Sequence, residues 1–354
     1  MEDTQDQIYL HQALELAKIR RGFCAPNPSV GAVIVKGSKV IATGYHLGPG
    51  QPHAEVDALA KLKNKAKGTT VYVTLEPCCH FGRTPPCTDA LIKAGVKRVV
   101  YGYRDPNPIV SGKGEAALSE AGILCEYFPL PEINSFYESY THWHTSQKPF
   151  ITAKIAMTLD GKIAGKDGER IQITGDALND FTHFFRKNTD AILTTIKTIL
   201  KDDPLMNARH QDETTSKKLY ILDSQLTMPL NAKVFKSTES ITIFHAKNAP
   251  PSQQEKLTKL GARCIPIDHA QDGLDLDQAV SAIGKDGIHD LWIESGGQCF
   301  TSFINKSLLQ RAFIYIAPRW LGEGISAFSQ PFDFRSEQIH WEQLGHDVLC
   351  EIHW

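Results

Sequence analysis

Four residues in the first part of the chain have side chains that could together catalyse a metal-assisted hydrolysis. His53 is separated from Glu55 by one residue, and Cys78 and Cys87 follow downstream. One imidazole and two thiols would give a zinc ion three protein ligands and leave the fourth tetrahedral position open for water. Bound zinc lowers the pKa of such a water to about 7. Glu55 would then be available to relay protons, because a general acid or base need not bind the metal.

The order of these residues is similar to the H-x-E and P-C-x-x-C signature of zinc-dependent nucleobase deaminases. The second cysteine departs from that signature, because residues 79–86 separate Cys78 from Cys87. Cys79 is a further thiol beside a predicted ligand. Adjacent thiols rarely both reach one zinc ion, so Cys78, which follows Pro77, is the predicted ligand.

The inserted residues and their flanks narrow this resemblance. Segments 53–56 (HAEV) and 74–87 (TLEPCCHFGRTPPC) closely resemble the bifunctional deaminase/reductase family of riboflavin biosynthesis. Segments 26–28 (PNP) and 105–108 (DPNP) fit the same family, and the resemblance extends over nearly the whole chain. It implies zinc-dependent deamination of 2,5-diamino-6-ribosylamino-4(3H)-pyrimidinone 5′-phosphate. It also implies NADPH-dependent reduction of the ribosyl group, which gives 5-amino-6-(5-phosphoribitylamino)uracil.

In the first half, the resemblance assigns roles to individual residues. It implies that Glu55 is catalytic and that one zinc ion binds to His53, Cys78 and Cys87. The implied substrate contacts lie at the pyrimidine end and toward the ribose phosphate, and they are Asn27, His46, Arg83, Asp105 and Asn107. Arg83 is chemically suited to clamp a phosphate, and Asp105 to bind sugar hydroxyls. An alternative for segment 105–108 is a simple turn, which its residue types favour.

The second half resembles the reductase domain of the same family, which has a dihydrofolate-reductase-like fold. The matching segments are 154–161, 194–204, 223–224, 294–297 and 317–319. The residues that would line the NADPH site are Ala156, Gln172, Thr198, Asp202, Ser224, Gly296, Gly297, Gln298, Cys299, Phe300, Thr301 and Ser302. The residues that would hold the substrate are Lys154, Arg170, Arg186, Met206, Arg209 and Glu294.

Several of these assignments have a plainer alternative. Arginine suits a sugar phosphate because guanidinium binds phosphate in a bidentate fork, but each arginine could also be a solvated surface charge. Asp202 could fix a loop instead of contacting the cofactor. Gln172 stands where the family often has tryptophan, so this chain has no aromatic ring at that position to stack on the cofactor. The Gly296-Gly297 turn before a helix would let backbone N–H groups approach a phosphate.

Length and composition limit the alternatives. A chain of 354 residues predicts two domains, 1–147 and 148–354. A net charge of −2 offers no polycationic surface for a nucleic-acid backbone. The first residues lack the basic start and apolar run of a signal peptide, and no stretch approaches the ~18 apolar residues of a membrane span. We therefore expect a cytoplasmic protein with mostly reduced cysteines, with small phosphorylated pyrimidines as its ligands and a homo-oligomeric state, dimer or tetramer.

Short strands and helices alternate in the first half, which predicts a three-layer α/β/α domain of the cytidine-deaminase-like kind. Strands are expected at 30–35, 40–45, 70–73, 98–103 and 123–127, and helices at 54–62, 88–94 and 115–121. One helix and a linker are expected within 129–149. Residues two apart inside a helix diverge by about 200°, so His53 must lie at or before the helix cap if it is to converge with Glu55. The second half is expected to be an α/β domain with strands at 150–157, 191–195, 219–223, 241–245, 291–294 and 312–317.

Two other functions fit part of the pattern. One is a deaminase of free or nucleic-acid bases with an unrelated C-terminal appendage, which the inserted residues and the phosphate-suited second half disfavour. The other is a non-enzymatic module stapled by zinc. A structural zinc site normally closes with a fourth cysteine or histidine, and the placement of Glu55 beside His53 favours catalysis.

Overall fold

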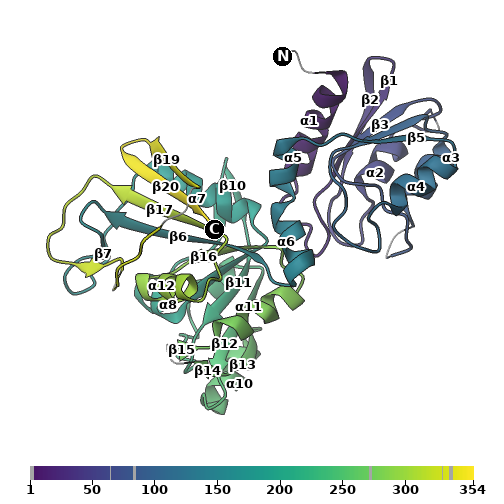
Figure 1. Cartoon of the computed structure of the whole chain (residues 1–354). Coiled ribbons are helices and arrows are strands. Elements are labelled where there is room, and N and C mark those ends of the chain that lie inside the picture. The colour runs from purple at the N-terminus through teal and green to yellow at the C-terminus, as the bar shows by residue number, and fades with distance from the viewer. Residues whose placement is uncertain (1–3, 64, 83–84, 271–272, 329, 335–337) are drawn as a thin grey trace. The chain divides into compact units, whose positions relative to one another are not determined.

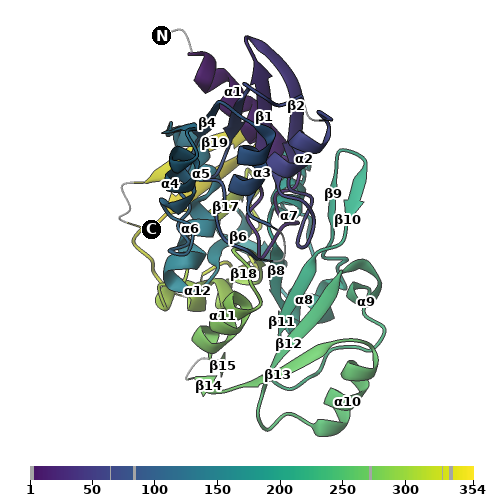
Figure 2. The same ribbon diagram turned by 90° about the vertical axis from the view of Figure 1, so that its right-hand side faces the viewer.

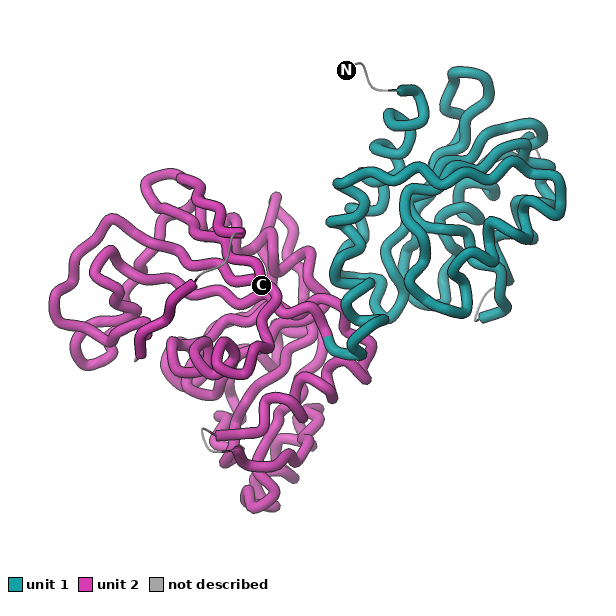
Figure 3. The backbone as a smooth tube through the Cα atoms, in the orientation of Figure 1, with its two compact units in different colours: residues 1–148 teal, residues 149–354 magenta. Residues whose placement is uncertain are grey.

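The computed structural model describes residues 4–63, 65–82, 85–270, 273–328, 330–334 and 338–354. The chain divides into two compact units, residues 1–148 and residues 149–354, which Figure 3 shows in teal and magenta. Each unit has its own sheet and its own hydrophobic core, and each is described by itself. No described helix is both long and apolar enough to pass through a membrane.

The first unit is built on a five-stranded sheet in the order β2-β1-β3-β4-β5 (Figure 1). The hairpin strands β1 and β2 are antiparallel, β1 is antiparallel to β3, and β3, β4 and β5 are parallel. The elements are α1 (Gln5–Lys18), β1 (Gly31–Lys36), β2 (Lys39–Tyr45), α2 (Ala54–Ala60), β3 (Thr70–Val73), α3 (Cys87–Ala94), β4 (Arg98–Tyr101), α4 (Lys113–Glu120), β5 (Leu124–Tyr127), α5 (Pro131–Phe136) and α6 (Glu138–Ser146).

Helices cover both faces of this sheet. Side chains alternate between the two faces along each strand, so each face presents apolar residues to its helices. On one face, Val33 and Tyr72 pack with apolar residues of α1 and α5. On the other face, Ile34, Val71 and Val73 pack with residues of α2 and α3. The result is the predicted three-layer α/β/α arrangement, with the helices α2, α3 and α4 on the face that carries the candidate zinc ligands.

The expected single helix between residues 129 and 149 was wrong, because two short helices, α5 and α6, occupy this segment. They are separated at Tyr137, whose backbone leaves helical geometry at φ −96° and ψ 8°. The Tyr137 hydroxyl is fully buried, where it donates to the Ser29 carbonyl and hydrogen-bonds Thr74 Oγ1. This tertiary contact explains a break that the local sequence does not indicate.

The second unit is built on a nine-stranded sheet in the order β13-β12-β11-β8-β16-β6-β17-β20-β19. Its elements are β6 (Phe150–Thr158), β7 (Lys162–Ala164), α7 (Asp176–Asn188), β8 (Ala191–Thr195), α8 (Ile196–Asp202), β9 (Ala208–His210), β10 (Glu213–Thr215), β11 (Lys218–Leu222), α9 (Val234–Ser237), β12 (Ser240–Ala246), α10 (Pro251–Lys259), β13 (Arg263–Ile267), β14 (His269–Ala270), β15 (Gly273–Leu274), α11 (Leu276–Lys285), β16 (Asp290–Glu294), α12 (Gly297–Asn305), β17 (Arg311–Ala317), β18 (Ile325–Ser326), β19 (Ile339–Leu344) and β20 (Asp347–His353).

The strands from β13 to β17 in this order are all parallel, and β20 and β19 add antiparallel strands at one side. Figure 2 shows β11, β12 and β13 running side by side. The two edges differ: β13 contains Pro266, and β19 is exposed along most of its length, with Trp341 58% exposed.

Helices cover both faces of the nine-stranded sheet. Apolar residues of α11 and α12, including Val280 and Phe303, form the core on one face. Residues of α7, α8 and α10, including Leu178 and Leu257, form the core on the other. Because the carboxyl ends of parallel strands meet at one edge of a sheet, the polar residues that end β6, β8 and β16, together with Asp223 directly after β11, gather there.

Candidate active sites

His53 and Glu55 are brought together by the start of α2. His53 is the N-cap residue and has extended backbone geometry, with φ −71° and ψ 164°. Glu55 lies in the first helical turn with its side chain 3% exposed. The cap conformation is the one that lets side chains two residues apart converge, as the sequence analysis required.

Cys78 and Cys87 reach the same point from two other segments. Cys78 lies in the loop after β3, and Cys87 is the first residue of α3, one position earlier than the expected helix start. His53 Nδ1 lies 3.2 Å from Cys87 Sγ and 3.5 Å from Cys78 Sγ. The Cys87 backbone N–H donates to Cys78 Sγ over 3.3 Å, so the start of α3 also favours a thiolate at Cys78.

The protonation of this cluster follows from these contacts. The pKa of Cys78 falls to about 4, chiefly because the Cys87 thiol donates a hydrogen bond to it, with His53 adding to the effect. The pKa of Cys87 is raised, because it keeps the shared proton and is buried. The hydrogen bond with Cys78 raises the pKa of His53, and burial raises the pKa of Glu55. A metal ion bound here would displace the proton that the two thiols share.

The donor set fits a zinc ion. One ligand atom from each of His53, Cys78 and Cys87 lies within 4.8 Å of the other two, and within the described residues this is the group with metal-binding geometry. Two thiols and one imidazole are typical zinc ligands, and a three-residue set leaves a position for water or substrate. Glu55 contributes a buried carboxyl group beside the cluster without belonging to it.

Asn27 and His46 lie beside the candidate zinc ligands, and their side chains contact each other. Asn27 Nδ2 lies 3.1 Å from His46 Nε2, and His46 Nδ1 lies 3.0 Å from the Pro52 carbonyl. The consistent assignment has Nδ1–H donating to Pro52 and Nε2 accepting from Asn27. Burial lowers the pKa of His46, so the ring is neutral, and it meets the His53 ring edge-on at 5.2 Å.

Asp105 and Asn107 form a turn after β4, which is the plainer alternative for this segment. Asp105 Oδ1 accepts from the Asn107 N–H at 2.9 Å and from the Tyr140 hydroxyl at 3.3 Å, and Asn107 Oδ1 accepts from the Ile109 N–H. Burial raises the pKa of Asp105 to about 6. Building the turn does not prevent the carboxylate from binding a sugar. Arg83, the expected phosphate clamp, lies outside the described residues.

In the second unit, Lys154 and Glu294 are register partners on the neighbouring parallel strands β6 and β16. The Lys154 ammonium lies over the Tyr315 ring, 5.0 Å from its centroid. Burial lowers the pKa of Lys154, although Glu294 opposes this effect. An ammonium with a lowered pKa beside an ionised carboxylate is suited to proton transfer.

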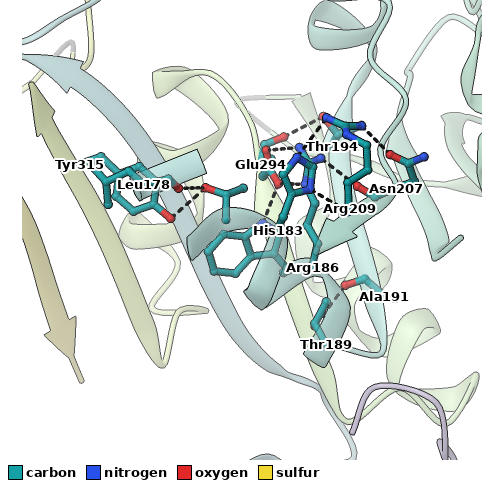
Figure 4. Close-up of polar contacts among 12 residues, drawn as sticks. Leu178, His183, Arg186, Thr189, Ala191, Thr194, Asn207, Arg209, Glu294 and Tyr315 are labelled. Carbon is teal, nitrogen blue, oxygen red and sulfur yellow. Dashed lines mark hydrogen bonds and ion pairs between the residues drawn. The ribbon is translucent and has the colours of Figure 1, made fainter. Parts of the chain in front are cut away.

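Arg186, on α7, donates from Nε and Nη2, along one edge of its guanidinium, to the two carboxylate oxygens of Glu294, with N–O distances of 2.5 and 2.8 Å (Figure 4). Its third nitrogen donates to the Asn207 carbonyl. Trp292 Nε1 donates to Glu294 Oε1 at 2.7 Å. Burial acts against ionisation of Glu294, but Arg186, Lys154 and Trp292 outweigh it and lower the pKa of Glu294 to about 2. The guanidinium of Arg186 is therefore occupied by protein groups, and the side chain is 12% exposed.

Arg209, on β9, lies in the same polar cluster and is more exposed than Arg186. Its guanidinium donates to Asn207 Oδ1 at 2.7 Å and lies 3.0 Å from His183 Nε2, while its backbone N–H donates to His183 Nδ1 (Figure 4). Burial and the nearby arginines lower the pKa of His183 to about 4, so this ring is neutral. Of Arg186 on α7 and Arg209 on β9, Arg209 is therefore the one whose exposure suits contact with a phosphate.

The Gly296-Gly297 turn lies directly after β16 and begins α12. A Cβ atom at Gly296 would meet nothing within 4 Å, whereas one at Gly297 would lie 1.7 Å from the Ala327 carbonyl. Among the described residues, the buried Thr301 hydroxyl on the first turns of α12 has no hydrogen-bond partner. Open space at a helix start and an orphaned hydroxyl fit a phosphate of NADPH. Lys197 on α8 donates to Gln298 and so links the two helices that carry the expected cofactor residues.

The remaining expected residues of the second unit differ in how well they are placed. Thr198 and Asp202 lie on α8, which begins where β8 ends. Arg170 is 75% exposed, and its Nε lies 3.7 Å from Asp202 Oδ1. The Gln172 carbonyl accepts from Arg319. The Met206 side chain is buried in the core, so its backbone would have to supply any substrate contact. Ala156 lies two residues before the end of β6, Ser224 follows β11, and Cys299, Phe300 and Ser302 lie on α12.

The sequence analysis missed several residues that organise these sites. In the second unit they are Trp292, His183 and Asn207. Trp292 lies two residues before Glu294 on one strand, and His183 lies three residues before Arg186 on one helix, so both spacings indicated a shared face. In the first unit, Tyr140 reaches Asp105 from a helix distant in sequence, which no local pattern predicts.

Comparison with protein-family models gives one match for each unit. The model of the cytidine and deoxycytidylate deaminase zinc-binding region matches residues 3–103. The model of the RibD C-terminal domain matches residues 149–350. These matches confirm the predicted fold class, a cytidine-deaminase-like α/β/α domain followed by a dihydrofolate-reductase-like α/β domain.

Full-length relatives are similar over both units. The riboflavin biosynthesis protein RibD of Aquifex aeolicus is 39% identical over 97% of this chain and 97% of its own length, and the RibD protein of Escherichia coli is 36% identical over 98% and 99%. The structure of Acinetobacter baumannii RibD has a TM-score of 0.86 at 34% identity, covering 99% of this chain and 98% of its own. A deaminase/reductase structure from Thermotoga maritima has a TM-score of 0.84 at 31% identity, with the same coverage.

Proposed function

Because the chain belongs to the RibD family of bifunctional riboflavin-biosynthesis enzymes, which use zinc and NADPH, we propose which residues perform each of its two reactions. The first unit deaminates 2,5-diamino-6-ribosylamino-4(3H)-pyrimidinone 5′-phosphate. The second unit reduces the ribosyl group of the deaminated product to ribityl. The boundary between the two activities lies at residues 147–148.

The observation that carries the first assignment is the convergence of His53, Cys78 and Cys87 beside the buried carboxyl of Glu55. A bound zinc ion supplies a water that is acidic near neutral pH. Glu55 would accept a proton from that water and so assist its attack on the amine-bearing ring carbon. Its raised pKa lets the carboxyl hold the proton and then pass it to the amine, which leaves as ammonia.

Two substitutions in the full-length protein test these roles. Cys87→Ala should lose the metal, measured as zinc per chain, and with it the deaminase activity. Glu55→Gln should keep the metal and lower deaminase turnover by ~10²–10⁴-fold, because it removes the proton carrier. Unchanged zinc content in Cys87→Ala would exclude this residue as a ligand, and full turnover in Glu55→Gln would exclude the carboxyl as the proton relay.

For the reductase, we propose that Lys154 is the proton donor and Glu294 the stabilising anion. NADPH supplies the hydride to C1′ of the ribosylamino group. Opening of the ring requires a proton at the ring oxygen, and the Lys154 ammonium, with its lowered pKa, can supply it. Glu294 remains ionised because its pKa is about 2, so it can stabilise positive charge that develops at C1′ and its nitrogen. Arg209 would bind the phosphate, and the start of α12 would bind the cofactor.

Lys154→Met tests the proton donor. Oxidation of NADPH with the deaminated intermediate should slow by ~10²–10⁴-fold, while deamination by the same protein is unchanged. A loss of less than threefold would show that the proton comes from elsewhere. A raised KM for the intermediate with unchanged turnover would instead assign Lys154 to binding.

We further propose how the first site recognises its substrate, and the oligomeric state and location of the protein. Asn27 and His46 would face the pyrimidine, and Arg83, Asp105 and Asn107 the ribose phosphate. Arg83→Ala should raise KM for the phosphorylated substrate without changing zinc content. The protein would work as a homo-oligomer in the cytoplasm, a location that agrees with the absence of disulfide bonds among its eight described cysteines.

A further inference from the structure

Glu76 has a buried carboxylate that neither reaction uses. It lies two residues before Cys78, and its side chain is 3% exposed. A carboxyl group at this depth requires partners, because burial without hydrogen bonds is strongly unfavourable. Its partners are backbone N–H groups from a helix that begins far downstream in sequence.

The carboxylate binds the first turn of α4 on both of its oxygens. Oε2 accepts from the Gly112 N–H at 3.1 Å, and Oε1 accepts from the N–H groups of Gly114 and Glu115 at 3.1 and 3.4 Å. Gly112 is the N-cap residue of α4 and has no side chain to bind these groups. The first N–H groups of a helix have no partner within the helix, and its dipole favours an anion there. Glu76 therefore acts as a cap supplied by another segment.

A second contact joins α4 to the same loop. A Cβ atom at position 114 would lie 2.0 Å from the Pro77 carbonyl oxygen, so the backbone of α4 packs directly on the residue before Cys78. On its other side, the Cys78 carbonyl accepts from the Thr88 N–H in α3. Residues 76–78 are thus held between the first turns of two helices.

We propose that Glu76 is a positioning residue of the zinc site, which holds Cys78 in place by tying the loop to the start of α4. This role rests on the proposed function of Cys78 as a zinc ligand. Both carboxylate oxygens are occupied by backbone N–H groups, so Glu76 is neither a ligand nor a proton carrier. It acts through the backbone of residues 76–78 on the direction from which the Cys78 sulfur reaches the metal.

Zinc affinity of the full-length protein tests the proposal, measured by competition with a chromophoric chelator. Glu76→Ala should weaken zinc binding by ~10–100-fold, the usual effect of removing a group that orients a ligand. Glu76→Gln keeps one carbonyl oxygen for the Gly114 N–H and should recover part of that affinity. Replacement of zinc by Co²⁺ gives a second readout, because its visible spectrum reports the ligand geometry. This spectrum should change in Glu76→Ala.

Matched variants separate this role from general destabilisation. Thr4→Ala removes the side-chain cap of α1 in the same unit and should leave zinc affinity unchanged. Gly114→Ala displaces the loop without changing its charge and should weaken zinc binding as Glu76→Ala does. NADPH oxidation on the deaminated intermediate reports whether each variant still has a folded second unit.

The outcomes are distinguishable. Wild-type affinity and an unchanged Co²⁺ spectrum in both Glu76→Ala and Gly114→Ala would refute the positioning role. Equal losses of affinity in Thr4→Ala and Glu76→Ala would refute it too, because any lost cap would then suffice. A wild-type protein that binds no zinc would instead refute the proposed zinc site itself. If Glu76→Ala does not fold, Glu76→Gln and Gly114→Ala decide the question by the same measurements.

Discussion

Substituting Arg186 with methionine would remove one partner of a buried ion pair and leave the other in place. Methionine is also long and unbranched, so it replaces most of the side-chain volume while deleting the guanidinium. Glu294 would keep its contacts with Trp292 and Lys154 but lose both hydrogen bonds from Arg186. Because both partners are largely buried, solvent would not replace the lost contacts, and the second unit should become less stable.

The magnitude follows from the acidity of Glu294. Its pKa falls from the ordinary 4.5 to about 2 in the folded protein, which corresponds to ~3 kcal/mol at about 1.4 kcal/mol per pKa unit. Removing one partner of a buried pair typically costs about 3–5 kcal/mol, in agreement with this value. A carboxyl with a lowered pKa stabilises the fold above pH 4.5, and this contribution is lost as the pH falls toward 2. The difference in unfolding free energy between Arg186→Met and the wild type should therefore become smaller as the pH is lowered.

Urea unfolding followed by tryptophan fluorescence measures this effect, because four of the five tryptophans, Trp292, Trp320, Trp341 and Trp354, lie in the second unit. Lys166→Met is a matched control, since it breaks an ion pair with Glu323 that is exposed on both sides. The control should change the unfolding free energy by less than about 1 kcal/mol. Two results would refute the stabilising role of the Arg186–Glu294 ion pair. One is a decrease in the unfolding free energy of less than ~1 kcal/mol in Arg186→Met. The other is a decrease that stays the same size when the pH is lowered.

Three further outcomes are expected. Burial raises the pKa of Asp105 to about 6, so this carboxyl favours folding fully below pH 3.8 and the contribution is lost as the pH rises through 6. Asp105→Asn should thus raise the thermal midpoint of the first unit at pH 7 while it increases KM for deamination, and a lowered midpoint would contradict the burial argument. Gly296→Ala should raise KM for NADPH without loss of stability, whereas Gly297→Ala should disturb α12 itself. Thermal unfolding and NADPH kinetics of the two variants measure these effects. Zinc chelation should abolish deamination and spare NADPH oxidation, and a parallel loss of both activities would contradict separate sites.

The sequence predicted best what depends on neighbouring residues. Strand β3 has the bounds expected from its apolar run, and the hairpin β1–β2 turns at Gly37, where φ is +63°. The candidate zinc ligands could be singled out because their types and order carry the chemistry, and the structure brings them together. Strand β19 gave no such signal, because both of its faces are largely exposed and its residues do not alternate.

The contacts that the sequence did not indicate are long-range. Glu76 and α4 are distant in the chain, and so are Arg186 and Glu294, so nothing local distinguishes these side chains from surface charges. The family resemblance implied that Arg186 holds the substrate, and its residue type suits a phosphate. In the structure its nitrogens are engaged by Glu294 and Asn207, and only the fold determines which arginine is left to meet a ligand.

The unlike edges of the nine-stranded sheet have a consequence for association. An open-ended row of molecules, joined strand to strand, needs two edges that can each accept a further strand. Pro266 interrupts the row of N–H groups on β13, so strand addition is disfavoured at that edge. β19 contains no proline. Two copies that paired through their β19 strands would leave no β19 edge free for a third copy. This arrangement permits a closed dimer and disfavours a growing fibre.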